Sequence, residues 1–314
     1  MIIVTGGLGF IGYNLIQHLN SIGISDIIII ENLKKSNSVD IKLRRLKNIK
    51  FIDLLDRENI DWNSFFTSST FKKFRCIFHL GACTDTTEKN INYLLENNYE
   101  WTKKLIYISH QYGIRMIYAS SASVYGNKNY AVNEEDQPDP LNYYAYSKFL
   151  IDNYFLNSIL SKMKSNIVGL RYFNVYGPHE ENKNNMSSVI FKFFNQIRKE
   201  GKIYLFEGSE NFRRDFIYVE DIIKINIFFM NNEYSGIYNC GTGKSESFLN
   251  VAKIFIEKIG YGEIEFIPFP ENLKHHYQTF TQANNKKLLN IMNIKFTTLQ
   301  EGIEKYLEYL KKSI

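Results

Sequence analysis

A serine, a tyrosine and a lysine in the middle of this chain have the types and spacing needed to oxidise an alcohol. Tyr144 lies four positions before Lys148 in the run YYAYSK, and Ser121 precedes both. Residues four positions apart share a helix face, so the ammonium can lie beside the phenol and lower its pKa. Such a phenol can take a proton from a sugar hydroxyl that Ser121 also hydrogen-bonds. Oxidation of an alcohol by a nicotinamide requires this proton transfer.

The N-terminal run GGLGFIG has the pattern of a turn that binds a pyrophosphate. Gly6, Gly9 and Gly12 are spaced GxxGxxG. They lie between a buried strand predicted at 2–4 and an amphipathic helix predicted at 10–19. Glycines at this point let backbone N–H groups and the helix N-terminus approach a phosphate. The motif therefore predicts that a dinucleotide binds at the end of the first strand.

Strands and helices alternate along the first half of the chain. This alternation is typical of an α/β fold with a Rossmann doubly wound parallel sheet. Such a sheet binds ligands at the carboxyl ends of its strands, where Glu31, Gly81 and Ser121 are expected. Further strands are predicted at 27–30, 49–52, 76–80, 116–119 and 167–170, and helices at 92–110 and 144–160.

The pattern becomes mixed after Arg171. We expect residues 1–171 to form the cofactor-binding Rossmann domain, with segments near 214–243 returning to it. Residues 172–314 are expected to form mainly a smaller mixed α/β lobe that closes over the substrate. The elements predicted in this half are a loop at 177–185, helices at 186–199, 248–259 and 299–310, and strands at 203–206 and 237–240.

Composition excludes several classes of protein. With 44% hydrophobic and 23% charged residues, the chain of 314 residues is ordinary for a soluble globular protein. No apolar run reaches the ~18 residues that span a bilayer, and a strand beginning at residue 2 leaves no room for a signal peptide. We therefore expect a cytoplasmic protein with no membrane partner.

The charges and cysteines exclude two further kinds of site. The net charge of +5 comes from lysines interleaved with acidic residues. They form no compact basic stripe, so nucleic acid is not an expected partner. Cys76, Cys83 and Cys240 are odd in number and include no CxxC pair. Reduced thiols and the absence of a metal site are therefore expected.

The residues after the second and fourth strands bear on the choice of cofactor. Glu31 stands where an acidic side chain commonly holds the ribose hydroxyls of NAD. Asn32, Lys34 and Arg57 could instead contact the 2′-phosphate of NADP. These residues leave the choice between NAD and NADP open. The segment His79 to Thr87 has small residues where the backbone must pass close to the cofactor.

Together, TGGLGFIG, HLGACT, YASSASVYG, YYAYSK and RYFNVYGP resemble the extended short-chain dehydrogenase/reductase family that acts on nucleotide sugars. Longer blocks are similar to those members that invert C6 of an ADP-activated heptose. These blocks are LNYYAYSKFL, VGLRYFNVYGP, LFEGSENFRRDFIYVEDI, YNCGTGKSESF and IPFPENLKHHYQTFTQA. The similarity covers essentially the whole chain.

The resemblance implies an isomerase that oxidises C6 of ADP-heptose to a ketone and returns the same hydride to the opposite face. Two acid/base groups are needed because the alcohol proton leaves and returns on different sides. Tyr144 matches the family's first base and Lys183, in PHEENKNNM, its second; Lys148 matches the lysine that binds the nicotinamide ribose. The family also implies tightly bound NADP (with NAD as the alternative), a role in lipopolysaccharide core synthesis, and a homo-oligomer, namely a pentamer.

The other site residues follow from the resemblance one position at a time. Asn97 in particular is a helical polar residue that only the family pattern assigns to the site. Arg214 suits a diphosphate, because its planar guanidinium binds two oxygens at once. The implied cofactor contacts are Gly6, Gly9, Phe10, Ile11, Gly12, Glu31, Asn32, Arg57, Leu80, Gly81, Ala82, Cys83, Thr84, Asn97, Lys148, Val175 and Lys183. The implied substrate contacts are Asn174, Asn185, Lys192, Phe206, Glu207, Gly208, Ser209, Arg214 and Tyr277.

The chain departs from the family pattern at five positions. Leu8 stands where Ala is usual, Tyr13 where Ser is common and His179 where Arg often follows GP. Glu31 replaces the usual Asp, and Ser38 lies about where the family has a lysine near the cofactor phosphate. None of these changes removes a reacting group, although the last two weaken the transfer of NADP preference.

Two other activities, and a cofactor-binding protein without activity, fit parts of the pattern. A 4,6-dehydratase would carry an Asp-Glu pair after its catalytic Ser or Thr, where this chain has Ala122 and Ser123. A 4-epimerase can work with one tyrosine, so Lys183 and the MSSV block that follows it are the discriminating features. A cofactor-binding protein without activity often loses the tyrosine or the lysine, and this chain keeps both.

Overall fold

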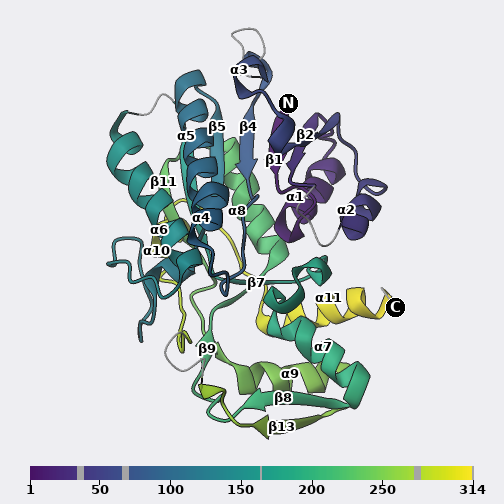
Figure 1. Cartoon of the computed structure of the whole chain (residues 1–314). Helices are drawn as coiled ribbons and strands as arrows, with labels where there is room; N and C mark the ends of the chain where they lie inside the picture. The colour runs from purple at the N-terminus through teal and green to yellow at the C-terminus, as the bar shows by residue number, and fades with distance from the viewer. Residues whose placement is uncertain (34–38, 66–70, 163–164, 272–276, 313–314) are drawn as a thin grey trace.

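The computed structural model of the chain describes residues 1–33, 39–65, 71–162, 165–271 and 277–312. Within these residues, seven parallel strands form one sheet in the order β11-β6-β5-β4-β1-β2-β3 (Figure 1). This order confirms the Rossmann doubly wound sheet. The strands are β1 (Ile2–Thr5), β2 (Ile27–Glu31), β3 (Asp53–Asp56), β4 (Cys76–His79), β5 (Arg115–Ser121), β6 (Ile167–Tyr172) and β11 (Gly236–Cys240).

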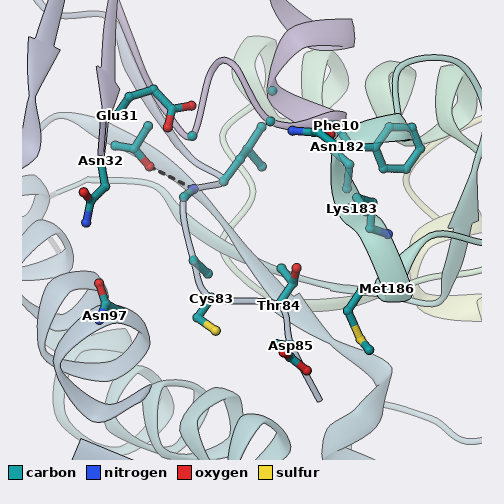
Figure 2. A pocket seen from close by; sticks show the side chains of 18 of the residues that line it. Phe10, Glu31, Asn32, Cys83, Thr84, Asp85, Asn97, Asn182, Lys183 and Met186 are labelled. Atoms are coloured by element: carbon teal, nitrogen blue, oxygen red, sulfur yellow. Dashed lines mark hydrogen bonds between the residues drawn. The ribbon is translucent and has the colours of Figure 1, made fainter. Parts of the chain in front are cut away.

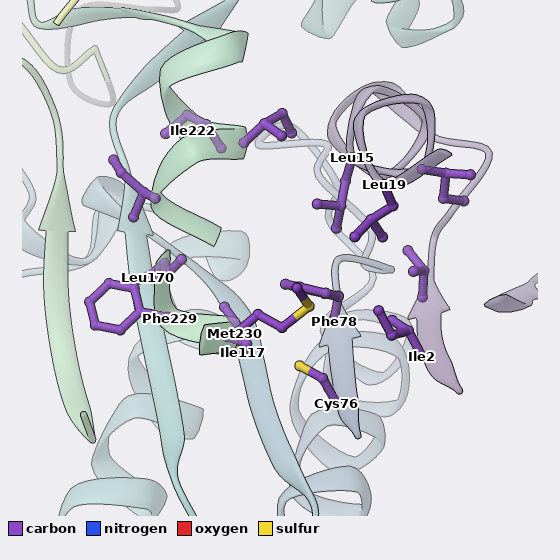
Figure 3. Close-up of a cluster of buried hydrophobic side chains, with 14 of the residues drawn as sticks. Ile2, Leu15, Leu19, Cys76, Phe78, Ile117, Leu170, Ile222, Phe229 and Met230 are labelled. Carbon is purple, nitrogen blue, oxygen red and sulfur yellow. The ribbon is translucent and has the colours of Figure 1, made fainter. Parts of the chain in front are cut away.

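Helices cover both faces of this sheet. On one face, α1 (Phe10–Ser21) and α8 (Val219–Asn231) pack Leu15, Leu19 and Phe229 against the strands (Figure 3). On the other, α5 (Trp101–Tyr112) and α6 (Tyr143–Tyr154) bury a second cluster. Because β1 and β2 are covered on both sides, all of their residues are buried, which explains their unbroken apolar runs.

The strand predicted at 49–52 is wrong. The third strand is instead β3, whose Asp53 pairs with Ile28. Leu54 and Leu55 in β3 pack against the clusters on opposite faces of the sheet, as successive residues of a strand do. Ile49 is buried in the connection that leads into β3, so an apolar residue is needed there although it does not belong to a strand.

The sequence analysis also missed α8. Its side chains are apolar on most sides and eight of its residues are buried. Its polar face is narrow, with only Glu220, Lys224 and Asn231 exposed, so the helical period is hard to see in the sequence. The helices predicted at 92–110 and 144–160 are confirmed, although each contains a π-helical segment (Leu95–Glu100 and Phe155–Ile159).

A separate buried cluster lies in the second half of the chain, below the main sheet in Figure 1. It is built from α7 (Val189–Glu200), α9 (Phe248–Ile259), α11 (Leu299–Lys312), β8 (Lys202–Phe206) and β10 (Phe216–Tyr218). β8 pairs with β13 (Glu263–Ile267). The division at residue 171 into a cofactor domain and a substrate lobe stays a prediction.

Part of the loop predicted at 177–185 is a short 3-10 helix, Glu181–Met186. The helix predicted from 186 begins at Val189, because Ser188 caps it by accepting a hydrogen bond from Phe191 N. No helix in the described ranges is both long and apolar enough to cross a membrane. The remaining elements are α2 (Val39–Leu46), α3 (Trp62–Phe65), α4 (Ile91–Leu94), α10 (Lys286–Leu289), β7 (Asn174–Tyr176), β9 (Arg213–Arg214) and β12 (Glu246–Ser247).

Candidate active site

The glycine-rich turn brings the ends of β1 and β4 into direct backbone contact. Gly6 has a φ of +65°, and a Cβ added there would lie 2.6 Å from the backbone of Gly81. A Cβ on Gly12 would lie 2.2 Å from the carbonyl oxygen of Gly6. No side chain fits at either position, so the turn presents bare backbone at the N-terminus of α1.

Buried hydrogen bonds hold this turn in place. Thr5 Oγ1 accepts from Gly81 N at 3.1 Å and lies 2.7 Å from His79 Nδ1. His79 Nε2 lies 2.8 Å from Thr102 Oγ1. Burial lowers the pKa of His79 well below its ordinary value, so the ring is neutral. His79 therefore connects both strand ends to α5, a role that the sequence signalled only by its place in HLGACT.

A cavity of about 670 Å³ opens at the carboxyl ends of β1, β2 and β4 (Figure 2). Glu31 and Asn32 lie at one end of the view, and Phe10, Asn182 and Lys183 at the other. The structure thus brings together most of the expected cofactor contacts and one expected substrate contact. The predicted residues that line it are Gly6, Gly9, Phe10, Ile11, Gly12, Glu31, Asn32, Arg57, Leu80, Gly81, Ala82, Cys83, Thr84, Asn97, Lys183 and Asn185.

The end of the cavity near Glu31 carries two cations. Glu31 accepts hydrogen bonds from Leu8 N at 2.7 Å and from Lys42 Nζ at 2.8 Å. Arg57 lies 5.3 Å from the ring centroid of Trp101. The sequence analysis missed Lys42 because nothing in the pattern of α2 shows which of its three cations, Lys42, Arg44 or Arg45, faces the cavity. The expectations for Lys34 and Ser38 lie outside the described residues.

Tyr144 and Lys148 both lie on α6, and Ser121 is the last residue of β5. Asn142 caps α6 by accepting a hydrogen bond from Ala145 N at 2.9 Å. Tyr144 and Lys148 are buried. Burial raises the pKa of Tyr144, and a hydrogen bond with Ser121 opposes this rise.

The lowering of the phenol pKa by Lys148 stays a prediction. Lys148 Nζ lies 6.0 Å from the Tyr144 ring centroid and donates to Ala119 O at 2.8 Å. Burial lowers the pKa of Lys148 to about 8, against the opposing charge of Asp152. The ammonium is directed at a backbone carbonyl, so burial is the larger influence on the phenol.

Asn98 joins α6 to the cavity wall. Its side chain accepts from Cys83 N at 2.9 Å and donates to Cys83 O at 3.0 Å and to Ser147 Oγ at 2.9 Å. Cys83 lines the cavity and lies close enough to Tyr144 and Lys148 to raise the pKa of each. The sequence showed only two adjacent asparagines, and the π-helical segment places Asn97 in the cavity wall and Asn98 beneath it.

Lys183 enters the same cavity from the 3-10 helix. Its Nζ lies 5.2 Å from the centroid of the Phe10 ring. Burial lowers the pKa of Lys183, the Glu180 carboxylate opposes this, and Lys192 adds to it. A lowered pKa brings the amine closer to the range in which a general acid/base works.

The other expected substrate contacts do not line this cavity. Phe206 lies against Phe269, which also contacts Tyr277 at 5.2 Å between ring centroids. Arg214 lies 5.4 Å from the Tyr277 centroid, and burial lowers its pKa to about 10. Val175 and Lys148, both expected at the cofactor, also lie outside this cavity's lining. The remaining predicted site residues outside it are Ser121, Tyr144, Asn174, Lys192, Glu207, Gly208 and Ser209.

The glycine turn at β1 and the Ser, Tyr and Lys set at β5 and α6 define a nucleotide-cofactor enzyme of the short-chain dehydrogenase type. Residues 2–241 match the model of the NAD dependent epimerase/dehydratase family. The chain belongs to this family and is an epimerase-type isomerase of nucleotide-sugar metabolism.

Two similar proteins are both named ADP-L-glycero-D-manno-heptose-6-epimerase, and a third is a 4-epimerase. The ADP-L-glycero-D-manno-heptose-6-epimerase of Brachyspira hyodysenteriae is 47% identical over 320 residues, covering 100% of this chain and 98% of that protein. The crystal structure of the Helicobacter pylori enzyme of that name has a TM-score of 0.84 at 28% identity, covering 99% and 96% of the two chains. A UDP-N-acetylglucosamine 4-epimerase from Methanobrevibacter ruminantium reaches 0.84 at 26% identity, covering 100% and 98%.

Proposed function

We propose that this protein epimerises ADP-D-glycero-β-D-manno-heptose at C6, through a transient 6-keto intermediate, with a tightly bound nicotinamide cofactor. The observation that carries the proposal is Lys183 in the wall of the cavity that the glycine turn forms. It supplies a second ionisable group besides Tyr144. The 47% identity to the Brachyspira enzyme over the whole chain supports the choice of substrate.

The residues of the cavity fit a dinucleotide. Gly6 and Gly12 leave backbone exposed at the N-terminus of α1, where a pyrophosphate is favoured. Asn182 Oδ1 is buried without a hydrogen-bond partner among the described residues, although Asn182 lines the cavity. Such an acceptor is costly to bury unless a ligand bonds to it. When bound, the nicotinamide supplies the acceptor and donor of the C6 hydride.

Tyr144 and Lys183 would divide the proton transfers between them. In the oxidation, one side chain takes the hydroxyl proton of C6 as the carbonyl forms. In the reduction, the other gives a proton to the carbonyl oxygen after the ketone has presented its opposite face. Ser121 would hydrogen-bond the reacting oxygen from beside Tyr144, and Lys148 would hold the nicotinamide ribose. Each acid/base group thereby serves one of the two C6 epimers.

The sugar nucleotide would be held mainly by residues 172–314. Arg214 would bind the diphosphate beside Tyr277, since an anion would offset the burial that lowers the pKa of the guanidinium. Ser209 Oγ is buried without a partner among the described residues and could bond the ligand. The location in the cytoplasm, the homopentamer and the role in lipopolysaccharide core synthesis are part of the proposal and depend on the resemblance of the sequence blocks.

The proposal is tested against the nearest rival with two substrates. The protein is incubated separately with ADP-D-glycero-β-D-manno-heptose and with UDP-N-acetylglucosamine, and the configurations at C6 and C4 are followed by NMR. We expect inversion of the heptose at C6 and no change in the hexosamine. Inversion at C4 of the hexosamine alone would favour a nucleotide-sugar 4-epimerase.

We further propose that the cofactor is NADP. Lys42 and Arg57 place two cations near Glu31, where a 2′-phosphate would lie. Lys42→Ala should weaken NADP binding by about tenfold or more, as expected for a lost charge-assisted hydrogen bond. NAD binding should change little, because its ribose can bond to Glu31.

Calorimetric titration of cofactor-free protein measures both affinities, with the exposed Lys47→Ala as the control. Equal losses for NAD and NADP in Lys42→Ala would remove Lys42 from the 2′-phosphate site. The cofactor released from the purified protein on denaturation gives an independent result. NAD alone in that extract would contradict the NADP proposal.

A further inference from the structure

Arg45 on α2 joins three segments that are far apart in the sequence. Its side chain is almost completely buried. Nη1 donates to Leu8 O at 2.7 Å in the glycine-rich turn, and Nη2 donates to His179 O at 2.6 Å. Nη2 also lies 3.2 Å from a carboxylate oxygen of Glu181. A buried guanidinium is costly unless it is bonded in this way, so these contacts fix the relative positions of the segments.

Leu8, Tyr13 and His179, three of the positions where the chain departs from the family pattern, all contact Arg45. Leu8 supplies a carbonyl, and the guanidinium carbon lies 5.1 Å from the ring centroid of Tyr13. Tyr13 in turn packs edge-on against His179, with ring centroids 4.7 Å apart. The side chains of Tyr13 and His179 therefore pack together beside one cation, whereas Leu8 meets it through a backbone carbonyl that any residue would supply.

The backbone at His179 is shaped to meet Arg45. Among the described residues, His179 alone is a non-glycine residue with a positive φ, of 71°. Its Nδ1 lies 3.0 Å from Tyr309 Oη on α11. Burial lowers the pKa of His179 to about 4, so the ring is neutral beside the guanidinium at neutral pH. A left-handed residue costs free energy and persists only where its surroundings hold it.

These contacts lead directly to Lys183. Asn14 Nδ2 donates to Pro178 O at 2.9 Å, which fixes the start of the segment 178–183 against α1. Arg45 holds the middle of this segment, and Lys183 N donates to Glu180 O at 3.0 Å as the 3-10 helix begins. The end of the segment then places the Lys183 ammonium over Phe10 at the cavity.

We propose that Arg45 is a positioning residue, which holds the segment 178–183 on the glycine-rich turn and thereby places Lys183 for proton transfer. The inference rests on the proposed function, in which Lys183 acts on one of the two C6 epimers. Loss of Arg45 should impair the proton transfer made by Lys183 and spare the transfer made by Tyr144. A residue that merely stabilised the fold would affect both.

The test uses Arg45→Met, which keeps most of the side-chain length but removes the donors, with the exposed Arg44→Met on the same helix as the control. Purified holoenzymes are mixed with each C6 epimer, and the first appearance of reduced-nicotinamide absorbance is timed. We expect Arg45→Met to slow this oxidation by roughly 10 to 100-fold for one epimer only. That epimer should be the one affected by Lys183→Met.

Two further measurements keep the test decisive. In the double variant Arg45→Met with Lys183→Met, the oxidation of this epimer should be no slower than in Lys183→Met alone, whereas multiplied losses would overturn the proposal. Arg45→Lys keeps the charge and should give a smaller loss with the same epimer, which covers the case in which Arg45→Met does not fold. Equal slowing of both epimers in either variant would contradict the proposal. Failure of the proposed function would appear differently, as no C6 inversion by the unaltered protein.

Discussion

Tyr144→Phe should lower the rate of epimerisation by roughly 10² or more, as expected for a lost general acid/base. The substitution removes only the phenolic oxygen, so the buried ring keeps its packing. It also removes the hydrogen bond with Ser121 that opposes the rise in the Tyr144 pKa. The change should therefore appear in turnover, while the protein still binds its cofactor. Steady-state assays of C6 inversion measure the effect.

Tyr143→Phe is the matched control, because Tyr143 precedes Tyr144 on the same helix and is 48% exposed. It should leave turnover unchanged within about twofold, as surface substitutions usually do. Turnover by Tyr144→Phe within a fewfold of the unaltered protein would remove Tyr144 from the proton transfer. The same result would show that the hydrogen bond between Ser121 and Tyr144 is not needed for turnover.

Lys183→Met should have an effect of similar size, roughly 10² or more on turnover. Methionine retains most of the aliphatic chain beside Phe10 and loses the amine that burial and Glu180 tune. If each group serves one epimer, then Lys183→Met and Tyr144→Phe should block the initial oxidation of opposite C6 epimers. Single-turnover experiments starting from each epimer reveal this complementarity.

Lys199→Met on α7 is a suitable control, since the Lys199 side chain is 81% exposed. Near-normal epimerisation by Lys183→Met would contradict the two-base arrangement, and a 4-epimerase with a single tyrosine would then explain the site better. If both variants slowed the same epimer, the division of labour between the two groups would be wrong even though both were essential.

The sheet was largely predictable because its central strands are buried on both faces. Runs such as Ile27–Glu31 follow directly from that burial. The edge strand was predicted at 49–52 instead of at β3. Only Leu54 and Leu55 of β3 pack against the core, whereas the apolar residues at 49–52 lie in the connection before it. The helix α8 was missed because eight of its 13 residues are buried and its exposed polar face is too narrow to mark the helical period.

The cavity was predictable where backbone geometry demands particular residues. Glycines at the turn and small residues after β4 are needed for close approach, and they line the cavity as expected. Lys42 and Arg45 were not predictable, because α2 carries several cations and only tertiary packing selects those that face inward. The sequence likewise could not show that Lys148 would direct its ammonium to Ala119 O.

The central claim is that C6 is inverted by removal and return of the same hydrogen, with Tyr144 and Lys183 exchanging only the hydroxyl proton. It is tested most directly by incubating the holoenzyme with ADP-D-glycero-β-D-manno-heptose in deuterium oxide and examining C6 by NMR. We predict a mixture of both C6 epimers in which C6 carries no deuterium. Inversion accompanied by deuterium at C6 would show that the carbon exchanges with solvent, and absence of inversion would show that C6 is not the reacting centre; either result would contradict the claim.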